Sequence, residues 1–103
     1  MYLLDKYINE ILTICANTFD LSIEDIKSDK RNRNIVYCRK ACSIIIKEQL
    51  DVNLEYIGRS INKTGSAVSS YISSQPDNNY YKICISQCKK IIQETFKKHS
   101  NIT

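Results

Sequence analysis

The chain has 103 residues, a length that suits one domain with a single hydrophobic core. Apolar residues make up 43% of it and charged residues 25%, while two glycines and one proline are too few for the turns of a many-stranded β fold, so an all-α fold is expected. No apolar run approaches the roughly 18 residues that span a bilayer, and the charges of Asp5, Lys6 and Glu10 are unlike a signal peptide. We therefore expect a cytoplasmic protein.

The net charge of +4 is unevenly distributed along the chain. Residues 1–26 contain five acidic side chains and one basic side chain, whereas residues 27–40 contain six Lys or Arg and a single acid, Asp29. Such a basic segment attracts polyanions, nucleic acid above all, although a solvated helix face is the plainer explanation of any charge run.

Helical periodicity begins close to the N-terminus. In residues 3–19 apolar side chains recur at steps of three or four, which predicts an amphipathic helix buried through Leu4, Ile8, Ile11, Cys15 and Phe19. Ser22 then opens a Ser-Ile-Glu-Asp capping box for a short helix that ends at Ile26. Residues 27–34 contain no apolar side chain, so we expect an exposed loop there, named here the basic loop.

Apolar positions from Ile35 to Leu50 predict a long central helix. Asn53 is suited to cap a short helix over residues 54–60, and Thr64 to cap another that runs to about residue 74. Two short helices would therefore flank a tight turn.

Residues 75–79 are the clearest loop signal in the chain, and a final helix is predicted over residues 81–98, followed by a frayed end. The expected architecture is one domain over residues 1–103 with five to six helices.

Five cysteines are an odd number, and without an export signal a disulfide framework is not expected. Cys38 and Cys42, like Cys84 and Cys88, are four residues apart, and four thiolates would complete a tetrahedral zinc shell. The same spacing also puts each pair on one face of an apolar helix, where free cysteine packs as a small hydrophobe. Core packing is favoured, no metal is expected, and zinc remains the alternative.

Residues 54–74 carry the pattern of a helix-turn-helix. Ile57, Ile61, Val68 and Ile72 are placed to lock two helices together, with Gly58 as the small residue where they cross. Asn62 suits the turn because asparagine tolerates left-handed backbone angles. In such a motif the start of the second helix enters the major groove of DNA, which here presents Thr64, Gly65, Ser66, Ala67 and Ser69, with Lys63 near phosphates.

No catalytic arrangement is expected, and no cofactor. The only histidine, His99, falls in the tail, and no Ser/His/Asp or Cys/His set is paired by position. Gly58 and Gly65 are too far apart for a phosphate-binding loop.

These segments together resemble the C-terminal DNA-binding domain of the bacterial replication initiator DnaA and its Trp-repressor-like relatives. The similarity covers about residues 11–92 in one order. It rests on Cys15–Ile26, Asp29–Ile35, Arg39-Lys40, Lys47-Glu48-x-Leu50, Ile57-Gly58 and Val68.

The resemblance implies a role in DNA binding for particular residues. Arg31 corresponds to a loop arginine that enters the minor groove, where a narrow A·T-rich groove concentrates negative potential. The other positions near phosphates or the DNA backbone are Arg33, Arg39, Lys40, Lys47, Asn53 and Lys63. The family's base-reading Asp-His-Thr-Thr is replaced by Thr64-Gly65-Ser66-Ala67, so we expect a different or looser DNA site.

The sequence therefore predicts a sequence-specific double-stranded DNA-binding protein that lacks the initiator's nucleotide-binding motor. Relatives of this kind would serve replication or transcription, including in phages and mobile elements. The alternative is an all-α protein interaction module whose basic surface binds an acidic partner. Either protein could form homodimers through tyrosines of the terminal helices, Tyr2, Tyr7, Tyr80 and Tyr81.

Overall fold

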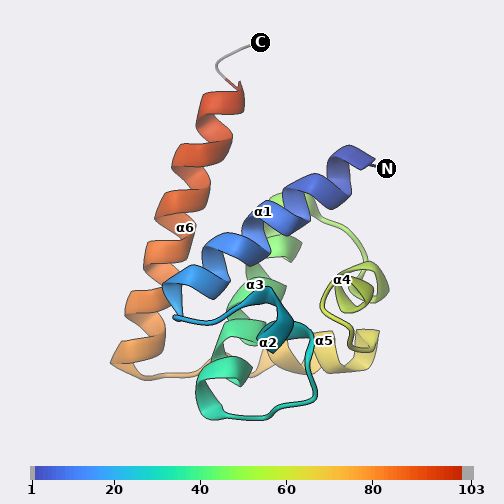
Figure 1. The fold of residues 1–103 in the computed structure, drawn as a ribbon, viewed down its shortest axis with the longest axis vertical. Helices are drawn as coiled ribbons and strands as arrows, with labels where there is room; N and C mark the ends of the chain where they lie inside the picture. The colour runs from blue at the N-terminus through green and yellow to red at the C-terminus, as the bar shows by residue number, and fades with distance from the viewer. Residues whose placement is uncertain (1, 101–103) are drawn as a thin grey trace.

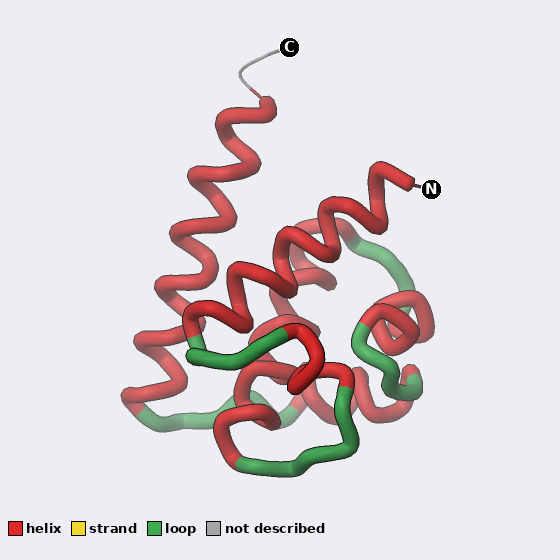
Figure 2. The backbone as a smooth tube through the Cα atoms, viewed as in Figure 1, coloured by secondary structure: helices red, strands yellow, loops and turns green. Residues whose placement is uncertain are grey.

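The computed structural model describes residues 2–100, and these residues form six α-helices without a strand. The helices are α1 (Tyr2–Thr18), α2 (Ile23–Lys27), α3 (Arg33–Leu50), α4 (Leu54–Ser60), α5 (Gly65–Ser73) and α6 (Asn79–Ser100). The predicted all-α class and the number of helices are confirmed. Figure 2 shows how short the connections between the helices are.

The central helix is α3, which contacts every other helix. In Figure 1, α1 and α6 cover one side of α3 and diverge toward the two chain ends, while α4 and α5 pair on the other side. The core lies between these layers and contains the apolar stripe predicted for the first helix, from Ile8 to Phe19. None of the helices within residues 2–100 combines the length and the apolar character needed to cross a bilayer.

Two helices begin earlier than the sequence predicts. Helix α3 starts at Arg33 rather than Ile35, because the backbone N–H of Val36 donates to the carbonyl of Asn32 at 3.0 Å. The side chain of Asn34 donates to the carbonyl of Phe19 at 2.6 Å. Helix α6 starts at Asn79 because Asn78 caps it, its side-chain oxygen accepting from the backbone N–H of Tyr81 at 2.8 Å. The non-helical part of the basic loop is therefore shorter than predicted, residues 28–32.

The cysteines pack in the core, as expected. All five thiols are free and buried, and Cys15 of α1 lies beside Cys42 of α3 and Cys88 of α6. Among residues 3–96, whose side chains the structure describes, no group of three or more His, Cys, Asp or Glu is arranged to hold a metal ion.

Of the four tyrosines expected at a dimer surface of the terminal helices, Tyr81 does not lie at the surface. Tyr81 is 2% exposed and belongs to the core, and the ring of Tyr7 packs 5.2 Å from that of Phe96. Tyr80 is 50% exposed. The side chains of Tyr2 and His99 lie outside the residues whose side chains the structure describes.

The helix-turn-helix of α4 and α5 has the predicted lock. Ile57, Ile61 and Val68 are fully buried, and Asn62 takes the left-handed conformation with φ of 61°. Ile72 is half-buried at the edge of the core. The turn is closed by the N–H of Lys63, which donates to the carbonyl of Gly58 at 2.7 Å.

Gly58 is required where the turn crosses the first helix. A Cβ atom at this position would lie 2.5 Å from the carbonyl oxygen of Lys63 and 3.0 Å from the carbonyl carbon of Thr64. Both are backbone atoms, so the turn itself would have to move.

We expect Gly58→Ala to lower the free energy of unfolding by about 1–3 kcal/mol, because the methyl group overpacks the turn. Chemical denaturation would measure it. Gly65→Ala is the matched control, since its Cβ would meet mainly the flexible Glu55 side chain, at 3.1 Å, and its loss should stay below about 1 kcal/mol. Equal losses at the two glycines would contradict the close approach at Gly58.

Candidate nucleic-acid interface

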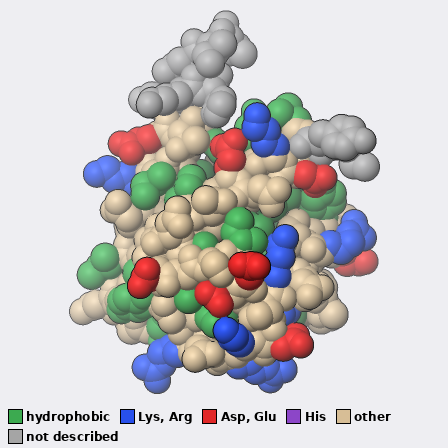
Figure 3. All heavy atoms as spheres, viewed as in Figure 1, with side chains coloured by type: hydrophobic (Ala, Val, Ile, Leu, Met, Phe, Trp, Pro, Cys, Tyr) green, Lys and Arg blue, Asp and Glu red, His purple; other side chains and the backbone are tan. Residues whose placement is uncertain are grey.

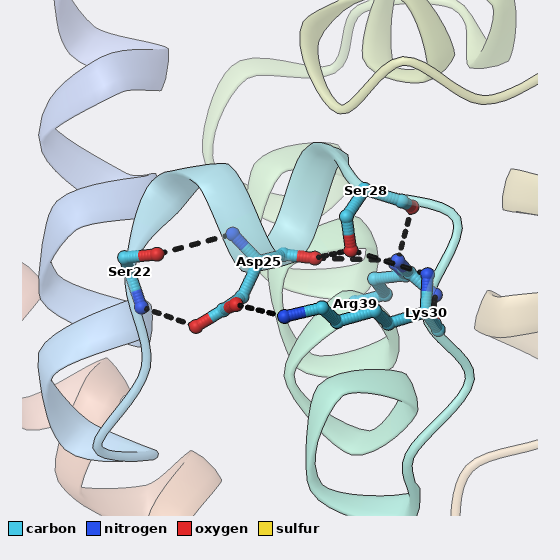
Figure 4. Close-up of polar contacts among 5 residues, drawn as sticks. All are labelled: Ser22, Asp25, Ser28, Lys30 and Arg39. Carbon is cyan, nitrogen blue, oxygen red and sulfur yellow. Dashed lines mark hydrogen bonds and ion pairs between the residues drawn. The ribbon is translucent and has the colours of Figure 1, made fainter.

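The basic loop leaves α2 from a well-defined helix start. Ser22 and Asp25 form the predicted capping box, in which each side chain accepts from the other residue's backbone N–H at 3.1 Å. The Asp25 carboxylate also pairs with Lys30 at 3.7 Å, and the hydroxyl of Ser28 donates to the carbonyl of Asp25 at 2.7 Å (Figure 4). The loop is therefore folded back onto the end of α2.

Arg39 occupies a different place from the one predicted. Its side chain is 2% exposed, and its guanidinium donates to the backbone carbonyl of Ile26 at 2.8 Å. It also donates to the carbonyls of Lys30 at 2.7 Å, Ser28 at 2.5 Å and Asp25 at 3.3 Å (Figure 4). A buried charge needs such partners to offset its lost hydration. Direct phosphate contact, which requires an exposed guanidinium, does not fit this position.

Two side chains of the helix-turn-helix also bind the basic loop. Lys63 donates from Nζ to the carbonyl of Ser28 at 2.6 Å, and Asn62 donates from Nδ2 to the carbonyl of Lys27 at 3.2 Å. Desolvation lowers the pKa of the Lys63 ammonium from its ordinary value, and the nearby charges of Arg39 and Arg31 lower it further against the opposing effect of Asp29. The turn and the loop thus touch although 35 residues separate Ser28 from Lys63.

The remaining cations and caps predicted at the interface have structural partners. Lys40 donates to the carbonyl of Ser74 at 2.9 Å, which ties α3 to the end of α5. Lys47 donates to the carbonyl of Val52 at 3.0 Å and pairs with Asp51 at 3.3 Å. The side chain of Asn53 caps α4 by accepting from the N–H of Tyr56.

Among the predicted interface residues, most of those that face solvent lie on the basic loop and at the start of α5. Arg31 and Arg33 are exposed, as are Ser66 and Ser69 on α5. Thr64 is exposed and caps α5, its hydroxyl accepting from the N–H of Ala67 at 3.1 Å. In Figure 3, Lys and Arg side chains gather along the lower edge, where Figure 1 shows the loop between α2 and α3.

A hollow of about 430 Å³ separates the basic loop from α5. Cations of the loop and the turn line one part of it, and apolar side chains line the rest. Its lining residues are Asp29, Arg31, Val36, Arg39, Lys63, Ala67 and Tyr71. The structure therefore brings Arg31, Lys63 and Ala67 together, whereas Lys40 and Lys47 are not part of this hollow.

Three lining residues, Asp29, Val36 and Tyr71, are not among the predicted interface residues. Tyr71 follows Ala67 by four residues, so helical spacing alone would have placed both on one face of α5. Val36 follows the basic loop on the first turn of α3, and its apolar side chain gave no sign of this position.

We expect the capping box to respond to acid. The backbone N–H of Ser22 lowers the pKa of Asp25 in the folded protein, and Lys30 lowers it further. The stability gained from ionised Asp25 is therefore present above the unfolded pKa, about 4, and is lost as the pH falls through the lower folded pKa. Wild type should exceed Asp25→Asn in stability at pH 7, with the difference disappearing in this acid range.

Thermal unfolding measured across pH would test this expectation. Glu24→Gln is the matched control, because Glu24 is the exposed neighbouring carboxylate of the same helix turn. The same acid-dependent difference in the control would contradict the role given to Asp25.

Comparison with known proteins identifies the family. The model of the bacterial dnaA protein helix-turn-helix matches residues 8–74. The chromosomal replication initiator protein DnaA of Nostoc sp. is 40% identical over 48 residues, and that of Trichormus variabilis 38% over 48 residues, each match covering 47% of this chain and 10% of the relative.

A third relative, the chromosomal replication initiator protein DnaA of Thermosipho africanus, is 33% identical over 64 residues, which cover 62% of this chain and 15% of the relative. The chain thus matches only a small part of the length of these proteins. No solved structure matches it. Since the matched region holds the basic loop and the whole helix-turn-helix, the chain belongs to the bacterial DnaA helix-turn-helix family.

Proposed function

We propose that this chain binds double-stranded DNA in a sequence-specific manner, in replication or transcription. The observation that carries the proposal is the joint position of two exposed elements, the basic loop and the start of α5, on either side of one cation-lined hollow. Family membership supports it, since the relatives are chromosomal replication initiators.

In the proposed complex α5 lies in the major groove. Exposed hydroxyls of Ser66 and Ser69 would donate to or accept from base edges, and the small Gly65 and Ala67 would permit a close approach to the duplex. Thr64 already uses its hydroxyl oxygen to accept from the N–H of Ala67. Its methyl group is the part suited to contact thymine.

Arg31 would enter the adjacent minor groove. It is exposed on the basic loop, and a narrow A·T-rich groove attracts an arginine by its concentrated negative potential. The DNA strand that passes between the two grooves would cross the hollow. Its sugar would lie against the apolar part of the lining, near Val36 and Tyr71, and Arg31 would supply the positive charge beside its phosphate.

We expect duplex affinity to fall steeply with salt, because each phosphate contact releases counterions. Three or four contacts predict a loss of about 100-fold between about 50 and 200 mM salt. Fluorescence anisotropy with a random-sequence duplex would measure it. Equal competition by polyglutamate would favour the interaction module instead, and no binding at low salt would exclude the proposed function.

We expect substitutions of Arg31, proposed for the minor groove, and of Ser66, proposed for the major groove, to affect DNA binding differently. Arg31→Ala should weaken binding to A·T-containing duplexes by about tenfold and remove the A·T preference. Ser66→Ala should change which sequences are selected from a random library more than it changes overall affinity. Selection with wild type and both variants would show it, and identical selected sequences from all three proteins would contradict it.

A further inference from the structure

The hydrogen bonds by which α3 residue Arg39 and the turn hold the end of α2 and the first part of the basic loop all end on backbone carbonyls of residues 25–30. The guanidinium of Arg39 in α3 donates four of these bonds, and the side chains of Asn62 and Lys63 in the turn donate one each. The carbonyl of Ser28 accepts from both cations, from Arg39 Nη2 at 2.5 Å and from Lys63 Nζ at 2.6 Å. A carbonyl oxygen has two lone pairs, so both bonds can form together.

The convergence of two cations is electrostatically unfavourable, and it is found where the loop meets the helix-turn-helix. Charge-assisted hydrogen bonds are about twice as strong as neutral ones, and Arg39 is almost fully buried. The loop is consequently attached both to α3 and to the segment that begins α5. The guanidinium of Arg39 is thereby committed to the loop backbone, and Lys63 directs one of its three ammonium donors to the same backbone.

We propose that Arg39 and Lys63 are positioning residues that fix the basic loop against α5, so that the spacing between the minor-groove and major-groove contacts is set before DNA binds. The expected effect on the spacing of the DNA site rests on the proposed DNA-binding function. The fixed position of the basic loop rests on contacts within the free protein. A preorganised pair of elements would tolerate only one spacing of the two parts of a DNA site.

The cause can be tested without DNA, by hydrogen exchange of the backbone amides of residues 28–32. Lys63→Met removes the ammonium and keeps most of the side-chain stem, so exchange of the loop amides should rise by about tenfold. Lys6→Met is the matched control, since Lys6 is an exposed lysine of α1, and it should leave the loop unchanged. Unchanged loop exchange in Lys63→Met would overturn the proposal.

The consequence can be tested with the duplex most enriched by wild type from a random library. Lys63→Met should weaken binding, keep the salt slope, and reduce the penalty for inserting one base pair between the A·T part and the rest of the site. A salt slope shallower by about 0.9 would overturn the proposal, because it would assign Lys63 to a phosphate. An unchanged insertion penalty would overturn it as well.

Arg39 is tested through Arg31. Arg39→Lys keeps the charge but cannot supply the forked donors, so Arg31→Ala should cost less than about twofold in that background although it costs about tenfold in wild type. If the two substitutions instead multiply their separate effects on DNA affinity, the proposal is overturned. If wild type binds no duplex, the proposed function and the spacing both fail, while the exchange experiment still decides whether Lys63 fixes the loop.

Discussion

A buried guanidinium must find acceptors for its donors, and this requirement shapes the side of the molecule that carries the basic loop. Arg39 meets it with four backbone carbonyls from the end of α2 and the loop. The carbonyls that close a helix are the negative end of its dipole, so a cation there is favoured. Because the loop backbone turns inward to Arg39, the side chains of Arg31 and Arg33 are left exposed.

The helix-turn-helix completes the same arrangement from the other side. The close approach at Gly58 and the left-handed conformation of Asn62 hold the turn tightly, and this restricts the position of the Lys63 backbone. From there its ammonium reaches the carbonyl of Ser28, which Arg39 already binds. Core packing through Ile57, Ile61 and Val68 thus positions the turn from which Lys63 reaches the basic loop.

The features that could be predicted from the sequence are those set by local chemistry. Apolar periodicity placed the helices, and the left-handed tolerance of asparagine placed the turn at Asn62. The burial of Arg39 could not be predicted from the sequence, because its acceptors are main-chain carbonyls, which every residue carries. The composition of a basic segment is also the same whether its arginine is exposed or buried. Helix α6 begins before the predicted residue because Asn78, which lies in a segment of loop-forming residues, caps the helix through a side chain that could equally form a turn.

The central claim is that the basic loop and the start of α5 form one preorganised DNA-binding surface. A titration of isotope-labelled protein with a short A·T-containing duplex, followed by NMR, tests it most directly. The backbone amides of residues 28–33 and 63–70 should shift together along one saturation curve, while those on the outer face of α6 stay in place. Shifts centred on α1 and α6, or loop and α5 amides that follow separate curves, would contradict the claim.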